Sequence, residues 1–219
     1  MCNQQTRCKL TELAGRTLDY YYQRIPFGQP VPLPVNLDFL LELAGGSIKM
    51  LPLSTDGSLL GLTVRERLIV RMVMSDGTVI RDTLRPQDIV VDSSLAGFRN
   101  TGNRNFTLAH EIGHQILHWY YPAGQWSAEQ EEEFADILAV EILLPERLVR
   151  ETAKFFQFPD TLAYASHSYL DDNYHRFKAM ARYLGVTRQI LADRMRELNI
   201  LTDDVPYRHS LPLLEGAPK

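Results

Sequence analysis

The segment TLAHEIGHQILH at residues 107–118 places three histidines four residues apart, with a glutamate directly after the first histidine. On an α-helix, which turns by about 100° per residue, the three histidines and Glu111 fall within one sector of about 100°. The small and apolar residues of the same turns fall on the opposite side: Ala109, Ile112, Gly113, Ile116 and Tyr120. We therefore expect a helix over 104–120 that packs one face on a sheet and turns the other face toward a polar site.

Two histidines one turn apart can bind the same metal ion, because residues i and i+4 of a helix stack above one another. Zinc accepts neutral imidazole nitrogens at about 2.0–2.1 Å, so His110 and His114 are candidate ligands. Glu111 is then placed to take a proton from the water that the metal activates, and to deliver it to the leaving amine. His118 does not fit as a ligand, because its Cα lies about 12 Å along the helix axis from that of His110. We expect His118 either to contact a metal ligand without binding the metal, or to pack between helices.

The third ligand has to come from another element, and SAEQEEEFADILAVEILLP at residues 127–145 predicts the next helix. Ser127 and Gln130 fit a capping box, and an acidic first turn suits the positive end of the helix dipole. We favour Glu132 as the third ligand over Glu129 and Glu133.

Asp136 lies one turn beyond Glu132 in a stretch that is apolar all round, so we expect this carboxylate to be buried and to need a partner. The partner that we expect is the second ring nitrogen of a metal-binding histidine. Three protein ligands leave a fourth coordination position open, which is typical of a catalytic zinc site. Ligand type favours one zinc ion per chain over manganese or iron, with manganese as the main alternative.

The composition is that of an ordinary globular protein, since 45% of the 219 residues are hydrophobic and 23% are charged. The net charge of −4 and the pI near 5.9 argue against wholesale electrostatic binding to nucleic acid or to an anionic membrane. Cys2 and Cys8 do not make a disulfide framework, and no stretch resembles a signal peptide or a membrane helix. We expect a soluble, cytoplasmic protein without a membrane partner, and the sequence indicates no particular oligomeric state.

Hydrophobic periodicity predicts an α+β fold, with a small, mainly antiparallel sheet packed on the active-site helix and a helical C-terminal subdomain after it. Two helices are expected first, over 9–24 and 35–44. Five β-rich runs follow, at 47–53, 58–64, 67–74, 78–84 and 88–92. Asp-Gly pairs at 56–57 and 76–77 signal hairpins between such runs. We divide the chain into a metallopeptidase domain (1–160), a C-terminal helical subdomain resembling a helix-turn-helix (161–205) and a loose tail (206–219).

RNFTLAHEIGHQILH at 104–118, followed by EEEFADILAVEILLP at 131–145, resembles the ImmA/IrrE-type metallopeptidase family, with the gluzincin-like pattern HExxH…ExxxD/N. The resemblance puts the family's metal-binding glutamate on Glu132 and its motif asparagine on Asp136. It implies a zinc-dependent endopeptidase of a bacterium, phage or mobile element that acts in transcription regulation. The substrate that it implies is a helix-turn-helix repressor protein, which is cleaved.

Two rival functions remain open from the sequence. Residues 173–198 carry six Lys/Arg against two acidic residues, Thr187 is a plausible N-cap, and the pattern resembles a helix-turn-helix. The protein could then be a metal-binding, DNA-binding regulator that uses Arg188, Arg194 and Arg196, a reading that we do not favour for an acidic chain. The other rival is an inactive repressor-binding module. Unranked candidates for stabilising the oxyanion of a peptidase are Tyr120, Tyr121, Tyr164, His167 and Tyr169.

Overall fold

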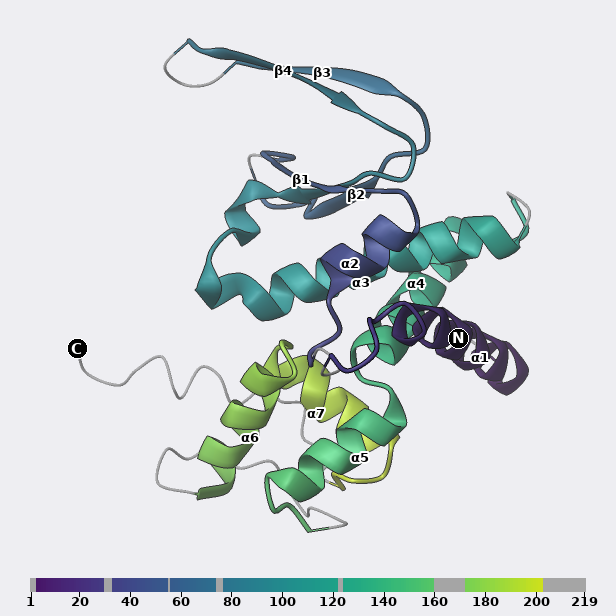
Figure 1. The fold of residues 1–219 in the computed structure, drawn as a ribbon, viewed down its shortest axis with the longest axis vertical. Coiled ribbons are helices and arrows are strands. Elements are labelled where there is room, and N and C mark those ends of the chain that lie inside the picture. Colours follow the sequence, from purple (N-terminus) through teal and green to yellow (C-terminus); the bar gives the residue numbers. More distant parts are fainter. Residues whose placement is uncertain are drawn as a thin grey trace, which may run out of the picture.

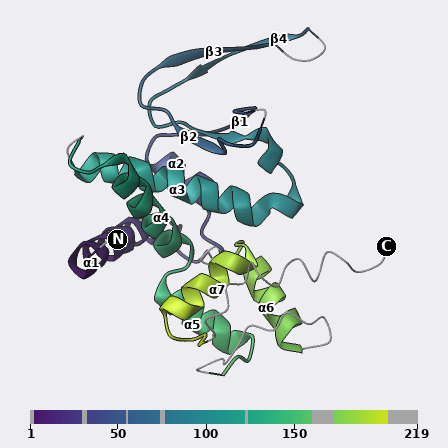
Figure 2. The ribbon, with the colours of Figure 1, turned by 180° about the vertical axis from the view of Figure 1, so that it is seen from behind.

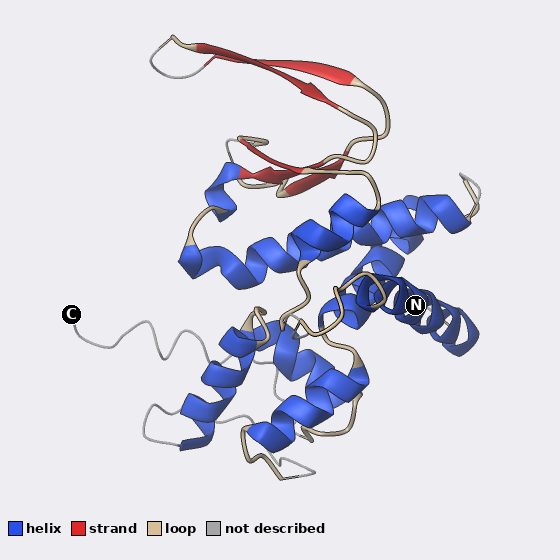
Figure 3. Cartoon of the chain, viewed as in Figure 1, coloured by secondary structure: helices blue, strands red, loops and turns tan. Residues whose placement is uncertain are grey.

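The computed structural model describes residues 3–29, 33–54, 56–73, 77–121, 124–159 and 172–202. It combines α-helices with a few short strands, which confirms the predicted α+β class (Figure 3). In chain order the elements are α1 (Gln4–Tyr22), α2 (Leu37–Leu43), β1 (Ile48–Leu51), β2 (Gly61–Thr63), β3 (Leu68–Val73), β4 (Val79–Leu84), β5 (Ile89–Asp92), the 3-10 turns η1 (Ser93–Leu95) and η2 (Phe98–Asn100), α3 (Thr101–Tyr120), α4 (Ala128–Leu143), α5 (Glu146–Phe155), α6 (Asp172–Tyr183) and α7 (Arg188–Glu197).

The strands form a three-stranded sheet and a separate hairpin. The sheet has the order β1-β5-β2, in which β5 is parallel to β1 and antiparallel to β2. β3 and β4 pair antiparallel, as the Asp-Gly signal at 76–77 predicts, and Gly77 has a positive φ of 83°. The hairpin predicted at Asp56-Gly57 is wrong, because β1 and β2 lie on either side of β5. All four residues of β5 are buried, so placing this strand at the centre of the sheet buries the most apolar surface. A hairpin that paired β1 directly with β2 would leave β5 at an edge.

The helices lie on one side of the sheet and the β3–β4 hairpin extends over the other side (Figure 1). α3 runs beneath the sheet and packs closely against α4, with α1 beside α4. α5, α6 and α7 form a further layer below α3, and the view from behind shows the same order of layers (Figure 2). Among the described residues, every helix is too short or too polar to cross a membrane.

The core explains why α3 lies where it does. Its apolar face is buried, with Ala109, Ile112 and Ile116 each at most 4% exposed. These side chains belong to one continuous apolar cluster that also includes residues of α1, α4 and the C-terminal helices. Gly113 permits the close crossing of α3 and α4, because a Cβ at this position would lie 2.9 Å from the carbonyl oxygen of Ala135. The opposite face of α3 is left free to carry polar side chains.

α6 and α7 follow one another through a short turn at the positions where two helices are expected. Gly185 ends the first helix with a positive φ of 65°, and Thr187 accepts a hydrogen bond from the backbone N–H of Ile190 at 3.2 Å, which begins the second. The Asn105 side chain of α3 donates to the carbonyl oxygen of Gly185 at 2.9 Å and links the two parts. The predicted tail at 206–219 lies outside the described residues, as do Tyr164, His167 and Tyr169.

Candidate metal centre

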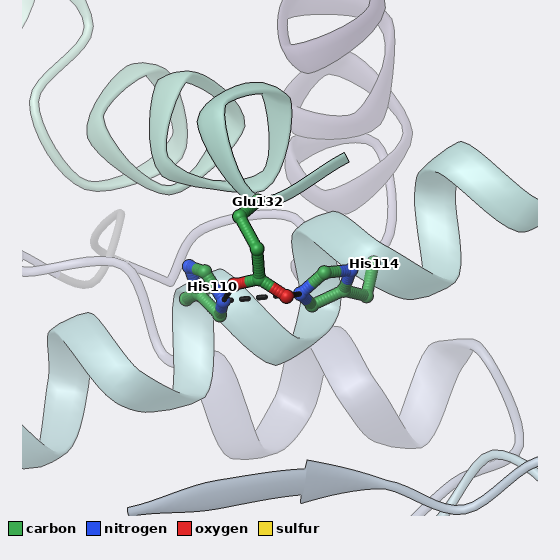
Figure 4. Close-up of side chains that lie close together, drawn as sticks. All are labelled: His110, His114 and Glu132. Atoms are coloured by element: carbon green, nitrogen blue, oxygen red, sulfur yellow. Dashed lines mark hydrogen bonds and ion pairs between the residues drawn. The ribbon is translucent and has the colours of Figure 1, made fainter. Parts of the chain in front are cut away.

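Three predicted ligands converge on one point between α3 and α4. His110 and His114 project from consecutive turns of α3, and Glu132 reaches down from α4 between their rings (Figure 4). The two Nε2 atoms are 3.0 Å apart. The Glu132 carboxylate lies 3.2 Å from Nε2 of His110 and 3.4 Å from Nε2 of His114. Each residue therefore offers one ligand atom within 4.8 Å of the other two.

The register between the two helices follows from how α4 begins. The predicted capping box is present, because the Ser127 hydroxyl accepts from the backbone N–H of Gln130 at 3.2 Å and the Gln130 side chain accepts from the Ser127 backbone N–H at 3.0 Å. α4 then runs antiparallel to α3, so Glu132 and Asp136, one turn apart, face His114 and His110. The facing pairs form because His110 and His114 are one turn apart on α3, as Glu132 and Asp136 are on α4.

Asp136 contacts the far side of the first histidine, as predicted. Its Oδ1 lies 2.8 Å from Nδ1 of His110, a contact that favours a proton on Nδ1, and that tautomer leaves the Nε2 lone pair for a metal. Burial by itself lowers the pKa of His110, but the hydrogen bond and charge of Asp136, together with Glu111 and Glu132, raise that pKa above its ordinary value. The prediction that Asp136 is buried is wrong, because its side chain is 57% exposed and lines the open groove.

His118 lies away from the three converging atoms, as the helix geometry predicts. Its Nε2 is 3.1 Å from Oε1 of Glu131, and the same carboxylate oxygen lies 3.3 Å from Nδ1 of His114. Burial lowers the pKa of His118, as do the charge of Arg65 and the nearby His114. The sequence does not single out Glu131, because the helix dipole already accounts for an acidic residue in the first turn of α4. The spacing of the third histidine, i+8 along α3, was the available signal for a further acidic partner on α4.

Glu111 is buried beside the three converging ligand atoms, and residues of the sheet contact its carboxylate. The Thr63 hydroxyl, on β2, donates to Oε2 of Glu111 at 2.8 Å. Gly61 of the same strand lies so close that a Cβ there would be 2.6 Å from Oε1 of Glu111. Neither Thr63 nor Gly61 was identified from the sequence, because nothing in a short β-rich run indicates which strand will lie over the site.

A groove of about 900 Å³ opens over the site. Its floor carries the histidines and acidic residues of α3 and α4, and its wall is formed by the chain from Ser58 to Leu68, which includes β2. The exposed leucines of this wall are Leu59, Leu60, Leu62 and Leu68. β2 is an edge strand of its sheet, so an extended peptide could lie along the wall with one side chain against the leucines.

The described candidates for stabilising the oxyanion do not reach this groove. Tyr120 lines a separate apolar pocket with Tyr20 and Trp119, and Tyr121 packs on Trp126 with ring centroids 4.4 Å apart. The other three candidates lie outside the described residues.

The donor set fits a metal such as zinc. Two imidazole nitrogens and one carboxylate are ligands that zinc accepts, and three protein ligands leave a further position open. Among the described residues this is the one group with such spacing, and neither Glu129 nor Glu133 belongs to it.

Comparison with known proteins agrees with this geometry. The Peptidase M78 family model, described as the IrrE N-terminal-like domain, matches residues 75–196, more than half of the chain. The chain belongs to this family. The matched range of this M78 member includes α3 and α4 with the candidate site, and it extends through most of α7. Membership supports a metallopeptidase-type function. No curated protein matches the chain.

Proposed function

We propose that this M78 family member is a zinc-dependent endopeptidase in which His110, His114 and Glu132 hold one zinc ion. The observation that carries the proposal is the convergence of the three ligand atoms within 4.8 Å at the floor of an open groove. A buried glutamate next to the first histidine provides the proton acceptor that hydrolysis needs.

The protein groups divide the work of peptide hydrolysis among them. A zinc ion in this site supplies a Lewis acid that polarises the scissile carbonyl and lowers the pKa of the attacking water. Glu111 accepts the proton of that water and later delivers it to the nitrogen of the leaving amine. Thr63 holds the Glu111 carboxylate in place with its hydrogen bond, and Asp136 orients the His110 ring.

We propose a helix-turn-helix repressor as the substrate, in line with the ImmA/IrrE resemblance. The groove supports an extended polypeptide as the substrate, since its wall is an edge strand flanked by leucine side chains. Backbone hydrogen bonds along β2 would hold a peptide of varied sequence, while the leucines would favour a large apolar residue.

The contacts of the C-terminal arginines weigh against the DNA-binding rival. Arg194 is 4% exposed and donates to Glu141 at 2.6 Å and to the carbonyl oxygen of Leu144 at 3.0 Å. Arg188 donates to the Tyr174 hydroxyl at 2.8 Å. Side chains held in this way serve packing within the molecule, so we do not favour direct binding to nucleic acid.

The test measures metal per chain by elemental mass spectrometry on untagged wild-type protein, Glu132→Ala and Glu129→Ala. We expect one zinc in the wild type, a large loss in Glu132→Ala and no loss in Glu129→Ala. Glu129 is exposed at the same end of α4, so its substitution removes the same charge but no metal ligand. A folded wild type that takes up no metal after zinc is added would contradict the proposal. Cleavage of a purified repressor encoded beside the protein would then separate a peptidase from an inactive repressor-binding module.

A further inference from the structure

Glu131 occupies a position that its neighbours on α4 do not share. Its Oε1 lies 3.3 Å from Nδ1 of His114, 3.1 Å from Nε2 of His118 and 3.3 Å from a terminal nitrogen of Arg65. The side chain is 26% exposed, whereas that of Glu132 is 64% exposed. A solvated residue of an acidic first turn would not have three nitrogen neighbours around one oxygen.

The two candidate histidine ligands pose the same chemical problem. Each neutral ring can offer Nε2 to a metal only when its Nδ1 carries the proton, and a proton on a largely buried ring needs an acceptor. Asp136 is that acceptor for His110, at 2.8 Å. For His114 the acceptor next to Nδ1 is Glu131, at 3.3 Å. Without this acceptor the His114 ring could rotate or adopt the other tautomer.

Arg65 is a further neighbour of the Glu131 carboxylate. It lies in the segment between β2 and β3, on the wall of the groove, and its ion pair with Glu131 joins that wall to α4. Adjacent residues of a helix project about 100° apart, so Glu132 points between the two rings while Glu131 reaches the outer side of His114. The carboxylate thus has contacts from the groove wall and from α3.

We infer that Glu131 is a positioning residue of the metal centre, which holds His114 in the tautomer and orientation that present Nε2 to the ion. This inference rests on the proposed zinc site and assigns Glu131 no contact with the metal or the substrate. Groups that orient metal-binding histidines in this way typically contribute about 10- to 100-fold to metal affinity.

The test compares zinc affinities, measured by competition with a chromophoric chelator, for the wild type, Glu131→Ala, Glu131→Gln and Glu129→Ala. We expect Glu131→Ala to bind zinc about 10- to 100-fold more weakly. Glu131→Gln should recover most of the affinity, because its amide oxygen can accept the same hydrogen bond from Nδ1. Glu129→Ala should match the wild type, and the thermal midpoints of the metal-free variants should agree.

Each outcome has a distinct meaning. Equal losses in Glu131→Ala and Glu129→Ala would show a general effect of charge and overturn the inference. Normal zinc binding by the wild type with unchanged affinity in Glu131→Ala would overturn the role of Glu131 and leave the proposed function intact. A wild type that binds no zinc would instead overturn the metal centre itself, and the inference with it.

Discussion

Three histidines at equal spacing on α3 have three different surroundings. The ring of His110 has Asp136 behind it and that of His114 has Glu131. Nε2 of His118 lies 3.1 Å from the same Glu131 oxygen but forms no hydrogen bond within the described part of the chain. Their roles therefore depend on the acidic residues of α4 that face them, and Glu111 on the same helix is set apart by its contact with the sheet.

Glu111→Gln should retain zinc and lose proteolysis. The amide keeps the shape of the side chain but cannot accept the proton of the attacking water, so we expect activity to fall at least about 100-fold. The check is cleavage of the purified repressor alongside metal content. Unchanged cleavage would remove the general-base role.

His118→Ala should lower zinc affinity only modestly, whereas His110→Ala should abolish tight binding. His118 lies two turns from His110 on α3 and contacts Glu131 but none of the three ligand atoms. Competition with a chelator measures both variants. Complete loss of zinc from His118→Ala would mean that it binds the metal directly.

At the scale of elements, the position of β2 over α3 decides the geometry of Glu111. Gly61→Ala should reduce cleavage on the order of 100-fold with zinc retained, because the new Cβ would displace the carboxylate from its place. Gly15→Ala is the matched control, since a Cβ there meets nothing within 4 Å and activity should not change. Comparing cleavage rates and zinc content of both variants tests the contact, and normal cleavage by Gly61→Ala would contradict it.

Asp92 links the end of β5 to the segment after β1, close to the groove wall. Hydrogen bonds from the Ser94 side chain, and from the backbone N–H groups of Leu53 and Ser94, lower the pKa of Asp92 to about 2. Asp92→Asn should destabilise the protein by about 2 kcal/mol at pH 7, as expected for hydrogen bonds to a charged group.

The pH dependence of that difference has a definite sign. The folded-state pKa of Asp92 is below its usual value, so its stabilisation is complete above about pH 4 and is lost as the pH falls through about 2. Urea unfolding of both proteins at several pH values should show the difference shrinking in acid. Asp56→Asn, in an exposed loop, should barely change the unfolding midpoint, and a difference independent of pH would contradict the assignment.

At the scale of the whole molecule, one buried ion pair ties the C-terminal layer to α4. Arg194 of α7 reaches Glu141 of α4 at 2.6 Å, and their side chains are only 3% and 7% exposed. Glu141 also accepts a hydrogen bond from Thr11 of α1 at 3.2 Å, so three helices meet at this carboxylate. The α6–α7 pair is therefore integrated with the helix that carries Glu132.

Arg194→Ala should destabilise the protein by about 3–5 kcal/mol, because it leaves the Glu141 charge buried without its partner. Arg147→Ala is the control, since Arg147 is 89% exposed and pairs with Glu151 one turn further along the same helix. Urea unfolding measures both. Equal midpoints for Arg194→Ala and the wild type would show that this ion pair does not stabilise the fold.

Local patterns predicted α1 to α4, the β3–β4 hairpin and the side chains that converge between α3 and α4. The four-residue spacing of His110 and His114, the capping box at Ser127 and the Asp-Gly signal at 76–77 each concern residues close together in the chain. Physical rules that act over one or two turns can be read from such segments. Glu132 was favoured for the same reason, since one helical turn relates it to Asp136.

What the sequence by itself determined is the local chemistry: the site helix, the acidic helix that faces it and the residues able to bind a metal. Only the tertiary structure decided that β5 separates β1 and β2, that Gly61 and Thr63 lie against Glu111, that Asp136 faces solvent and that Glu131 lies behind His114. These features depend on which elements pack together, because burial of apolar area in the shared core sets strand order and helix crossing over long sequence separations. The residue spacing within one segment does not indicate which other segments it packs against.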